Sequence, residues 1–205
     1  MVRKTKAEAE MTRLAIIDAA RAVFYARGVS HTSLEEVARA AGVTRGAVYW
    51  HFHGKTDLFY AMREQGRQPF KVVIDSELAD LSIVDPLAAI ERALCTMIDL
   101  LRNDAKVRQT LEIMVLRCEY VDEFAHVLQC LSDSHEDLLH KLRGQYARAA
   151  DLGQLNPRLE PVALAMETLL FLLGLVHRWL GDKANRDSAI WAEAISAHVL
   201  SKRAA

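Results

Sequence analysis

The sequence of 205 residues has few cysteines and almost no net charge. Its three cysteines, Cys95, Cys118 and Cys130, are odd in number and form no C-x-x-C pair, which disfavours a disulfide framework or a zinc site and fits a reducing cytoplasm. The most apolar run, residues 169–176, is too short to span a bilayer, and no apolar segment of a signal peptide follows the basic N-terminus. We therefore expect a soluble cytoplasmic protein without metal, cofactor or membrane partner.

The charges of the chain are unevenly distributed. Residues 1–55 contain nine Lys or Arg against five Asp or Glu, a formal charge of +4, which leaves −5 for the rest because the whole chain carries −1. A basic N-terminal region on an acidic body is typical of a DNA-binding head carried by another domain. The basic residues Arg3, Lys4 and Lys6 precede the first helix and form either a frayed terminus or an arm that touches DNA.

Residues 32–52 contain the strongest local pattern. Small and apolar side chains recur there at three- and four-residue spacing, with an interruption at Gly42, which predicts two short helices joined by a tight turn. Ser33 and Glu36 have the spacing of a capping box for the first helix, and Thr44 can cap the second. Gly42 can adopt the positive φ that the turn requires.

The outward face of the second short helix is basic and aromatic. An ordinary helical hairpin is the alternative to a DNA-binding element, but Tyr49 and Trp50 would then be costly surface. A helix of about two turns with Arg45 at its start has the size and chemistry to enter a major groove. The outward positions are Arg45, Gly46, Tyr49, Trp50 and His51.

The quoted residues also resemble a known family. The segment TSLEEVARAAGVTRGAVYWHFHGKTDLF closely resembles the helix-turn-helix of TetR-type repressors, and MVRKTKAEAEMTRLAIIDAARAVFYARGV resembles their first helix. The RKTK arm and the TRGAVYWHF string are typical of the AcrR-like branch, which represses multidrug efflux pumps. The resemblance is specific over roughly the first 60 residues; beyond them only the helical layout and the short strings RCEY and HRWL resemble the branch.

The resemblance implies a homodimeric repressor, bound as one dimer or as a pair of dimers to a near-palindromic operator in double-stranded DNA, that is released by a hydrophobic small molecule. Control of a multidrug efflux operon is expected, with a metabolic or degradative operon as the alternative. Arg45 is the candidate for a base contact and Gly46 for close approach of the backbone, whereas Lys55 suits a phosphate near a helix N-terminus. The full predicted DNA-binding set is Thr32, Ser33, Thr44, Arg45, Gly46, Tyr49, Trp50, His51 and Lys55.

The fold class expected is all-α, with a three-helix DNA-binding domain over residues 1–54 and a helical ligand-binding and dimerisation domain over residues 55–205. The first helix is expected from about residue 7 to residue 27, where Gly28 ends it. Its apolar stripe should consist of Leu14, Ile17, Ala20 and Phe24, with Val23 as a further candidate. Gly66 and Pro69 should interrupt the helix that follows residue 54, with a kink or break at Pro69. The further helices are expected at residues 86–101, 104–120, 122–152, 162–180 and from 185 or 187 to 201.

Two faces of the body point to partners. Residues 162–180 are apolar nearly all round, which predicts a dimer interface, although a central helix of a monomer would have the same pattern. A mixed Met, Cys and Leu face with His135 and His177 predicts a cavity for an apolar ligand, with an ordinary core as the alternative. The predicted ligand-binding set is Cys95, Ile98, Leu111, Met114, Val115, His135, Leu138, Leu142, Phe171 and His177.

Two other function classes are weaker. An enzyme would need several carboxylates grouped with a His or Cys as a catalytic or metal site, and the candidates Glu112, Glu119, Asp122 and Glu123 form no recognised set of this kind. The sequence is therefore not expected to be an enzyme. A nucleoid-type DNA binder without a ligand is the third hypothesis, and it would show no operator preference over bulk DNA.

Overall fold

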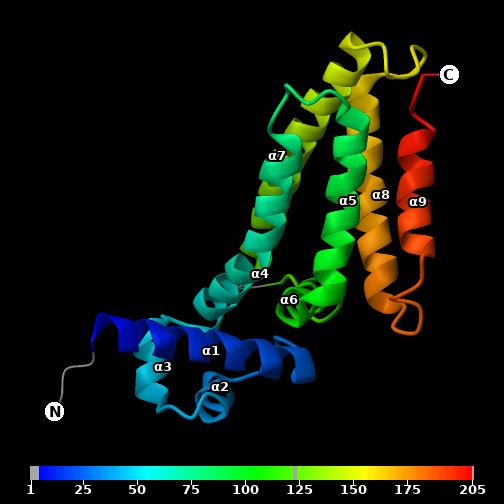
Figure 1. Ribbon diagram of the computed structural model, residues 1–205. Coiled ribbons are helices and arrows are strands. Elements are labelled where there is room, and N and C mark those ends of the chain that lie inside the picture. Colours follow the sequence, from blue (N-terminus) through cyan, green and yellow to red (C-terminus); the bar gives the residue numbers. More distant parts are fainter. Residues whose placement is uncertain (1–4, 122–123, 205) are drawn as a thin grey trace. The chain divides into compact units, whose positions relative to one another are not determined.

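The computed structural model describes residues 5–121 and 124–204, and within these residues all regular structure is helical, as the sequence predicted (Figure 1). The helices are α1 (Lys6–Arg27), α2 (Leu34–Ala40), α3 (Arg45–His51), α4 (Lys55–Leu78), α5 (Pro86–Asn103), α6 (Ala105–Leu116), α7 (Ala125–Asp151), α8 (Pro161–Gly181) and α9 (Ile190–Leu200). The predicted arm residues Arg3 and Lys4 lie outside the described residues, and Lys6 is exposed at the start of α1.

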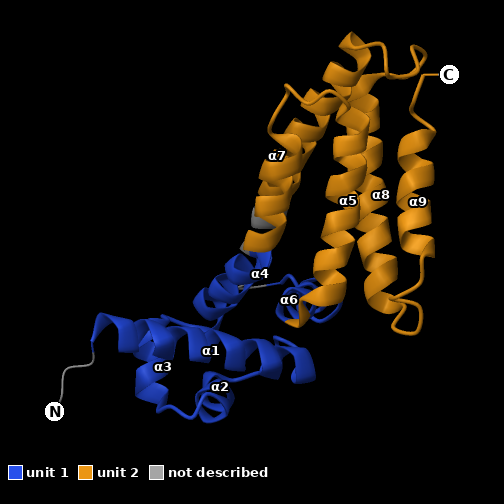
Figure 2. Cartoon of the chain, viewed as in Figure 1, with its two compact units in different colours: residues 1–67, 106–128 blue, residues 68–105, 129–205 orange. Residues whose placement is uncertain are grey.

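The chain divides into two compact units (Figure 2). The first unit spans residues 1–67 and 106–128, of which 1–4 and 122–123 are outside the described residues. The second spans residues 68–105 and 129–205. The first unit thus contains the helix-turn-helix together with the start of α4 and most of α6. The functional division after residue 54 stays a prediction.

The first unit has one hydrophobic core, in which α1 packs on α2 and α3. Ile17, Ala20 and Phe24 are buried as predicted, but Leu14 is exposed and Ile16 takes its place in the core. The buried stripe therefore differs from the expected one at this single position. The same core also contains Val37 and Ala38 of α2, Val48 of α3, Phe52 just after α3, and side chains of α4 and α6.

Local capping sets the ends of the head helices. Thr5 and Glu8 form a capping box at the start of α1, which the sequence reading had not singled out. Ser33 and Glu36 form the predicted capping box of α2, and the Thr44 hydroxyl accepts from the Ala47 amide at 3.2 Å. Gly42 has φ of 66°, which confirms the predicted turn.

The helix α4 is continuous, so the predicted interruption at Gly66 and Pro69 is wrong, whereas a kink at Pro69 stays a prediction. The helix runs through Gly66 and Pro69 without interruption. A proline within a helix removes one backbone hydrogen bond, and the packing of the flanking turns can offset that loss. In the second unit the C-terminal part of α4 is held to α7, where the Gln145 amide donates to the carbonyls of Leu78 at 3.0 Å and Asp80 at 2.9 Å.

The second unit is a bundle of long helices. The Asp85 side chain caps α5 and also accepts a hydrogen bond from the Arg203 guanidinium at 3.0 Å. This bond connects the C-terminal residues to the start of α5. The hydroxyl of Tyr146 on α7 is hydrogen bonded to Thr168 on α8 at 2.7 Å, and Thr168 to His198 on α9 at 2.9 Å. The expected ends shift by a few residues elsewhere: α6 ends at Leu116, and α7 starts at Ala125.

The helix α8 presents an exposed apolar stripe in this single chain. Its members are spaced by four, four and three residues and are Val162, Met166, Leu170 and Leu173. By length and composition alone α8 is also long and apolar enough to cross a membrane. That property is weak evidence, because a core helix of a soluble protein shares it.

Candidate nucleic-acid interface

The core of the first unit fixes which face of α3 is exposed. Val48 on α3 and Phe52 just after it are buried against α1, so the opposite side of this two-turn helix faces solvent. Tyr49 is 47% exposed and Trp50 is 72% exposed. The Trp50 indole meets the His51 ring edge-on at 4.5 Å between ring centres. A large exposed indole and phenol on a short helix form a surface that suits a bound partner.

Arg45 stands at the first position of α3, within a chain of exposed contacts. Its guanidinium forms an ion pair with Glu35 of α2 and lies 5.3 Å from the centre of the Tyr49 ring. A guanidinium nitrogen also donates to the Tyr49 hydroxyl at 3.4 Å. This hydrogen bond, with the nearby negative charge, raises the pKa of Arg45. A guanidinium is positively charged at neutral pH in any case.

Gly46 follows Arg45 in α3, and no contact among the described residues requires a glycine there. Its φ is not positive, and a Cβ built on it would meet only the Thr44 hydroxyl, at 3.9 Å. That distance is ordinary van der Waals contact. A glycine lowers helix stability relative to alanine. Close approach of another molecule is therefore the physical reason for glycine that the site supports.

Several predicted DNA-binding residues form contacts within the first unit itself. Thr32 is buried, and its hydroxyl donates to the Gly28 carbonyl at 2.8 Å, which removes its side chain from the exposed face. Ser33 and Thr44 serve as helix caps. The Lys55 ammonium donates to the Ser30 carbonyl at 3.2 Å. His51 is half-buried beside Trp50.

A buried polar network links α1 with α4 and α6 inside the first unit. Arg21 is only 2% exposed, and its guanidinium donates to Thr110 at 3.1 Å, to Asp18 at 2.7 Å and to Gln65. Partial burial opposes the ionisation of Asp18, but hydrogen bonds from Lys106 and Arg21 outweigh it and lower the pKa of Asp18. Sequence reasoning missed this network, although Arg21, four residues after Ile17 on the apolar stripe of α1, was the available signal.

Two family models cover most of the chain. Residues 16–62 match the bacterial regulatory proteins of the tetR family, and residues 85–202 match the C-terminal region of MAATS-type transcriptional repressors. The chain belongs to the TetR family. The resemblance predicted from the helix-turn-helix is thereby confirmed.

Relatives of this TetR-family protein agree with that assignment. The HTH-type transcriptional regulator TtgR of Pseudomonas putida is 35% identical over 180 residues, which cover 88% of this chain and 85% of TtgR. The crystal structure of NalD, the secondary repressor of the MexAB-OprM multidrug efflux pump in Pseudomonas aeruginosa, has a TM-score of 0.82 at 32% identity and covers 97% of this chain and 98% of NalD.

A third relative is SmeT, the repressor of the Stenotrophomonas maltophilia multidrug efflux pump SmeDEF. Its complex with triclosan has a TM-score of 0.77 at 29% identity and covers 91% of this chain and 90% of SmeT. These relatives are transcriptional regulators and repressors of efflux pumps, which confirms the AcrR-like branch predicted from the sequence. Its similarity to these relatives identifies this TetR-family chain as a transcriptional repressor. The names of the relatives describe regulators and not enzymes.

The predicted ligand-binding set of this TetR-family repressor has varied surroundings. Ile98, Leu138 and Leu142 are buried in the second unit, whereas Val115 and His177 are exposed. The half-buried members are Cys95, Leu111, Met114, His135 and Phe171. Met114 packs against the core of the first unit. The Phe171 ring stacks on His198 of α9, with 4.1 Å between ring centres. The set stays a prediction.

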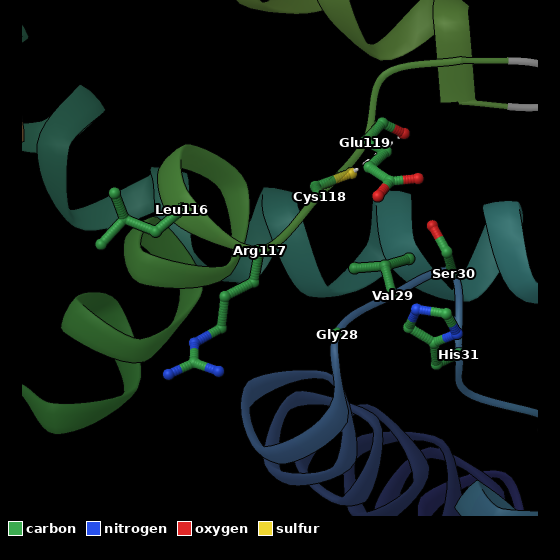
Figure 3. A pocket seen from close by; sticks show the side chains of 8 residues that line it. All are labelled: Gly28, Val29, Ser30, His31, Leu116, Arg117, Cys118 and Glu119. Carbon is green, nitrogen blue, oxygen red and sulfur yellow. Dashed lines mark hydrogen bonds between the residues drawn. The ribbon is translucent and has the colours of Figure 1, made fainter.

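A small open cleft of about 160 Å³ lies within the first unit (Figure 3). It is lined by Gly28, Val29, Ser30, His31, Leu116, Arg117, Cys118 and Glu119. In Figure 3 the Arg117 guanidinium points away from Cys118 and Glu119. Burial raises the pKa of the Cys118 thiol to about 11, which keeps it protonated at neutral pH. None of the predicted ligand-binding residues lines this cleft.

The carboxylates considered for an enzyme do not form a described site. Glu112 is buried and Glu119 is exposed, while Asp122 and Glu123 lie outside the described residues. Among residues 5–121 and 124–204, no three His, Cys, Asp or Glu side chains are grouped so that they could hold a metal ion.

Proposed function

We propose that this chain is a ligand-responsive cytoplasmic repressor that binds a near-palindromic operator as a homodimer. It controls a multidrug efflux operon and leaves the operator when a hydrophobic small molecule binds the helical domain of residues 55–205. The observation that carries the DNA-binding part is the exposed face of α3, where Arg45, Tyr49 and Trp50 surround a glycine that the fold does not need.

The roles within the interface follow from residue chemistry. The Arg45 guanidinium can present two donors to the acceptor pair of a guanine in the major groove. Gly46 lets the helix backbone approach the bases. Tyr49, Trp50 and Lys55 contact phosphates and position the head without reading sequence. Ser33 and Thr44 act mainly as caps that hold the two helices in place.

Dimerisation is proposed through α8 together with α9. The exposed stripe Val162, Met166, Leu170 and Leu173 would otherwise face water, and Ile190 and Leu200 of α9 are exposed as well. A two-fold dimer would present two heads to two half-sites spaced by about one helical turn of DNA, ~34 Å, or a multiple of it.

The inducer is proposed to be a hydrophobic small molecule. NalD and SmeT repress multidrug efflux pumps, and SmeT has been crystallised with triclosan, which supports the same ligand class here. Release requires that the ligand prefer a conformation whose heads do not match the half-sites. The helix α4 belongs to both units, so a change at one of its ends can alter the other.

The test of DNA recognition compares two variants. A footprint over the DNA upstream of the gene for this protein identifies the operator, and affinities are then measured for the operator and for a scrambled duplex of equal length. Arg45→Ala should lose operator preference, at a cost of about 1–3 kcal/mol. Lys55→Ala should weaken both affinities alike and flatten the salt dependence. An unchanged affinity ratio for Arg45→Ala would show that α3 does not read the bases.

The test of ligand release uses a variant with a larger side chain at a buried position of the proposed ligand-binding domain. Leu138 is buried on α7, and Leu138→Trp should occupy space that a ligand needs while leaving the head intact. Operator release by triclosan is measured for the parent and, if triclosan releases it, for the variant. Release of the variant at the parent's concentration would place the ligand elsewhere.

A further inference from the structure

The exposed ion pair between Glu35 and Arg45 joins the two helices of the helix-turn-helix. Glu35 is the second residue of α2, and Arg45 is the first residue of α3. Their side chains are 59% and 60% exposed, and on its other side Arg45 contacts the Tyr49 ring and hydroxyl. The guanidinium proposed to read DNA is therefore already held by a carboxylate in the free protein.

This carboxylate is electrostatically out of place on a DNA-binding surface. Residues 1–55 are basic overall, and a negative charge next to the principal arginine repels the phosphates that the head must approach. Glu35 is not the glutamate of the α2 capping box, because Glu36 performs that function. A favourable interaction with the α2 dipole is available to any acidic residue in that turn, and it does not require the contact with Arg45.

We propose that Glu35 is a specificity-determining residue. Its carboxylate holds Arg45 until the bases of the operator displace that carboxylate from the guanidinium. The inference rests on the proposed function, in which Arg45 contacts a base. On random DNA, Arg45 can only exchange the carboxylate for a phosphate, and Glu35 is then left beside the negatively charged backbone. On the operator, two base acceptors replace the lost ion pair. Glu35 thus weakens nonspecific binding more than operator binding.

The test uses Glu35→Gln, which removes the charge and nearly retains the size of the side chain. Affinities are measured over a series of salt concentrations on the footprinted operator and on a scrambled duplex of the same length. An exposed ion pair contributes little, so the affinity for scrambled DNA should rise about two- to five-fold. If the released Arg45 gains one phosphate, the salt slope on scrambled DNA should steepen by about 0.9. Operator affinity should change less, so the affinity ratio should fall.

A matched control separates this restraint from net charge. Glu10 on α1 is an exposed glutamate in the same unit, it pairs with Arg13 at 3.8 Å, and Glu10→Gln changes the formal charge by the same amount. This variant should shift both affinities by a common factor and leave their ratio unchanged. Thermal unfolding followed by circular dichroism checks that both variants fold.

Three results would overturn the inference. If Glu35→Gln and Glu10→Gln changed the two affinities equally, Glu35 would act only through its contribution to the net charge. A selective loss of operator affinity in Glu35→Gln would mean that the carboxylate itself contacts the operator. Unchanged affinities on both duplexes would leave Glu35 with no part in DNA binding. The Arg45→Ala variant, measured in parallel, distinguishes these failures from failure of the proposed function: if it retains operator preference, the role of α3 is wrong.

Discussion

Replacing Gly46 by alanine should separate the stability of the head from its affinity for DNA. The residue lies in the first turn of α3, has no positive φ and has open space where a Cβ would stand, apart from the Thr44 hydroxyl at 3.9 Å. Alanine is favoured over glycine within a helix by up to about 1 kcal/mol. The free energy of unfolding should therefore rise by roughly 0.5–1 kcal/mol, with an increase in Tm of about 1–4 °C for a chain of this size.

The same methyl group should weaken operator binding. If the base edges approach the α3 backbone at Gly46, the added carbon occupies space at a close-packed interface, where overpacking costs about 1–3 kcal/mol. That cost corresponds to a loss of affinity of roughly 5- to 150-fold. The expected signature is a protein that is more stable and binds its operator less tightly.

The assay combines thermal unfolding with operator titration for Gly46→Ala and a control glycine. Gly181 is the last residue of α8 and also has open space at the Cβ position. Gly181→Ala should leave operator affinity unchanged. The reasoning is refuted if Gly46→Ala binds the operator as tightly as the parent protein, because no molecule would then approach that position closely.

Three further predictions concern packing, pH and assembly. Gly66→Ala should lower the free energy of unfolding by about 1–3 kcal/mol, because its Cβ would lie 2.5 Å from the Thr110 methyl group; Thr110→Ser should recover part of this loss in denaturant titrations. Burial lowers the pKa of His198, Lys202 adds to the shift and Glu167 opposes it. The unfolded chain therefore takes up the proton first, and the free energy of unfolding should fall as pH drops below about 6.5, less so in His198→Gln. Leu170→Glu on the exposed face of α8 should give monomers in sedimentation, and a persisting dimer would refute the proposed interface.

The sequence by itself determined the local features of the head. The capping box of α2, the turn glycine and the starts of α2 and α3 depend on contacts within a few residues, so the spacing of Ser33, Glu36, Gly42 and Thr44 was sufficient to predict them. The outward face of α3 followed from the same periodicity. It could be assigned because Val48 and Phe52 have only one side of a short helix on which to be buried.

The tertiary structure decided the features that depend on a second element. Whether Leu14 or Ile16 enters the core, and whether Arg21 is buried, depends on how α4 and α6 pack against α1. Local rules predicted an interruption at Pro69, yet α4 runs through it, because most helical stability in proteins comes from tertiary packing rather than from propensity. His198 was not singled out because its partners Thr168 and Phe171 are about 30 residues away in the sequence and meet it only when α8 and α9 pack together. The pairing of Glu35 with Arg45 likewise required the turn geometry that brings two separate helix N-termini within reach of one ion pair.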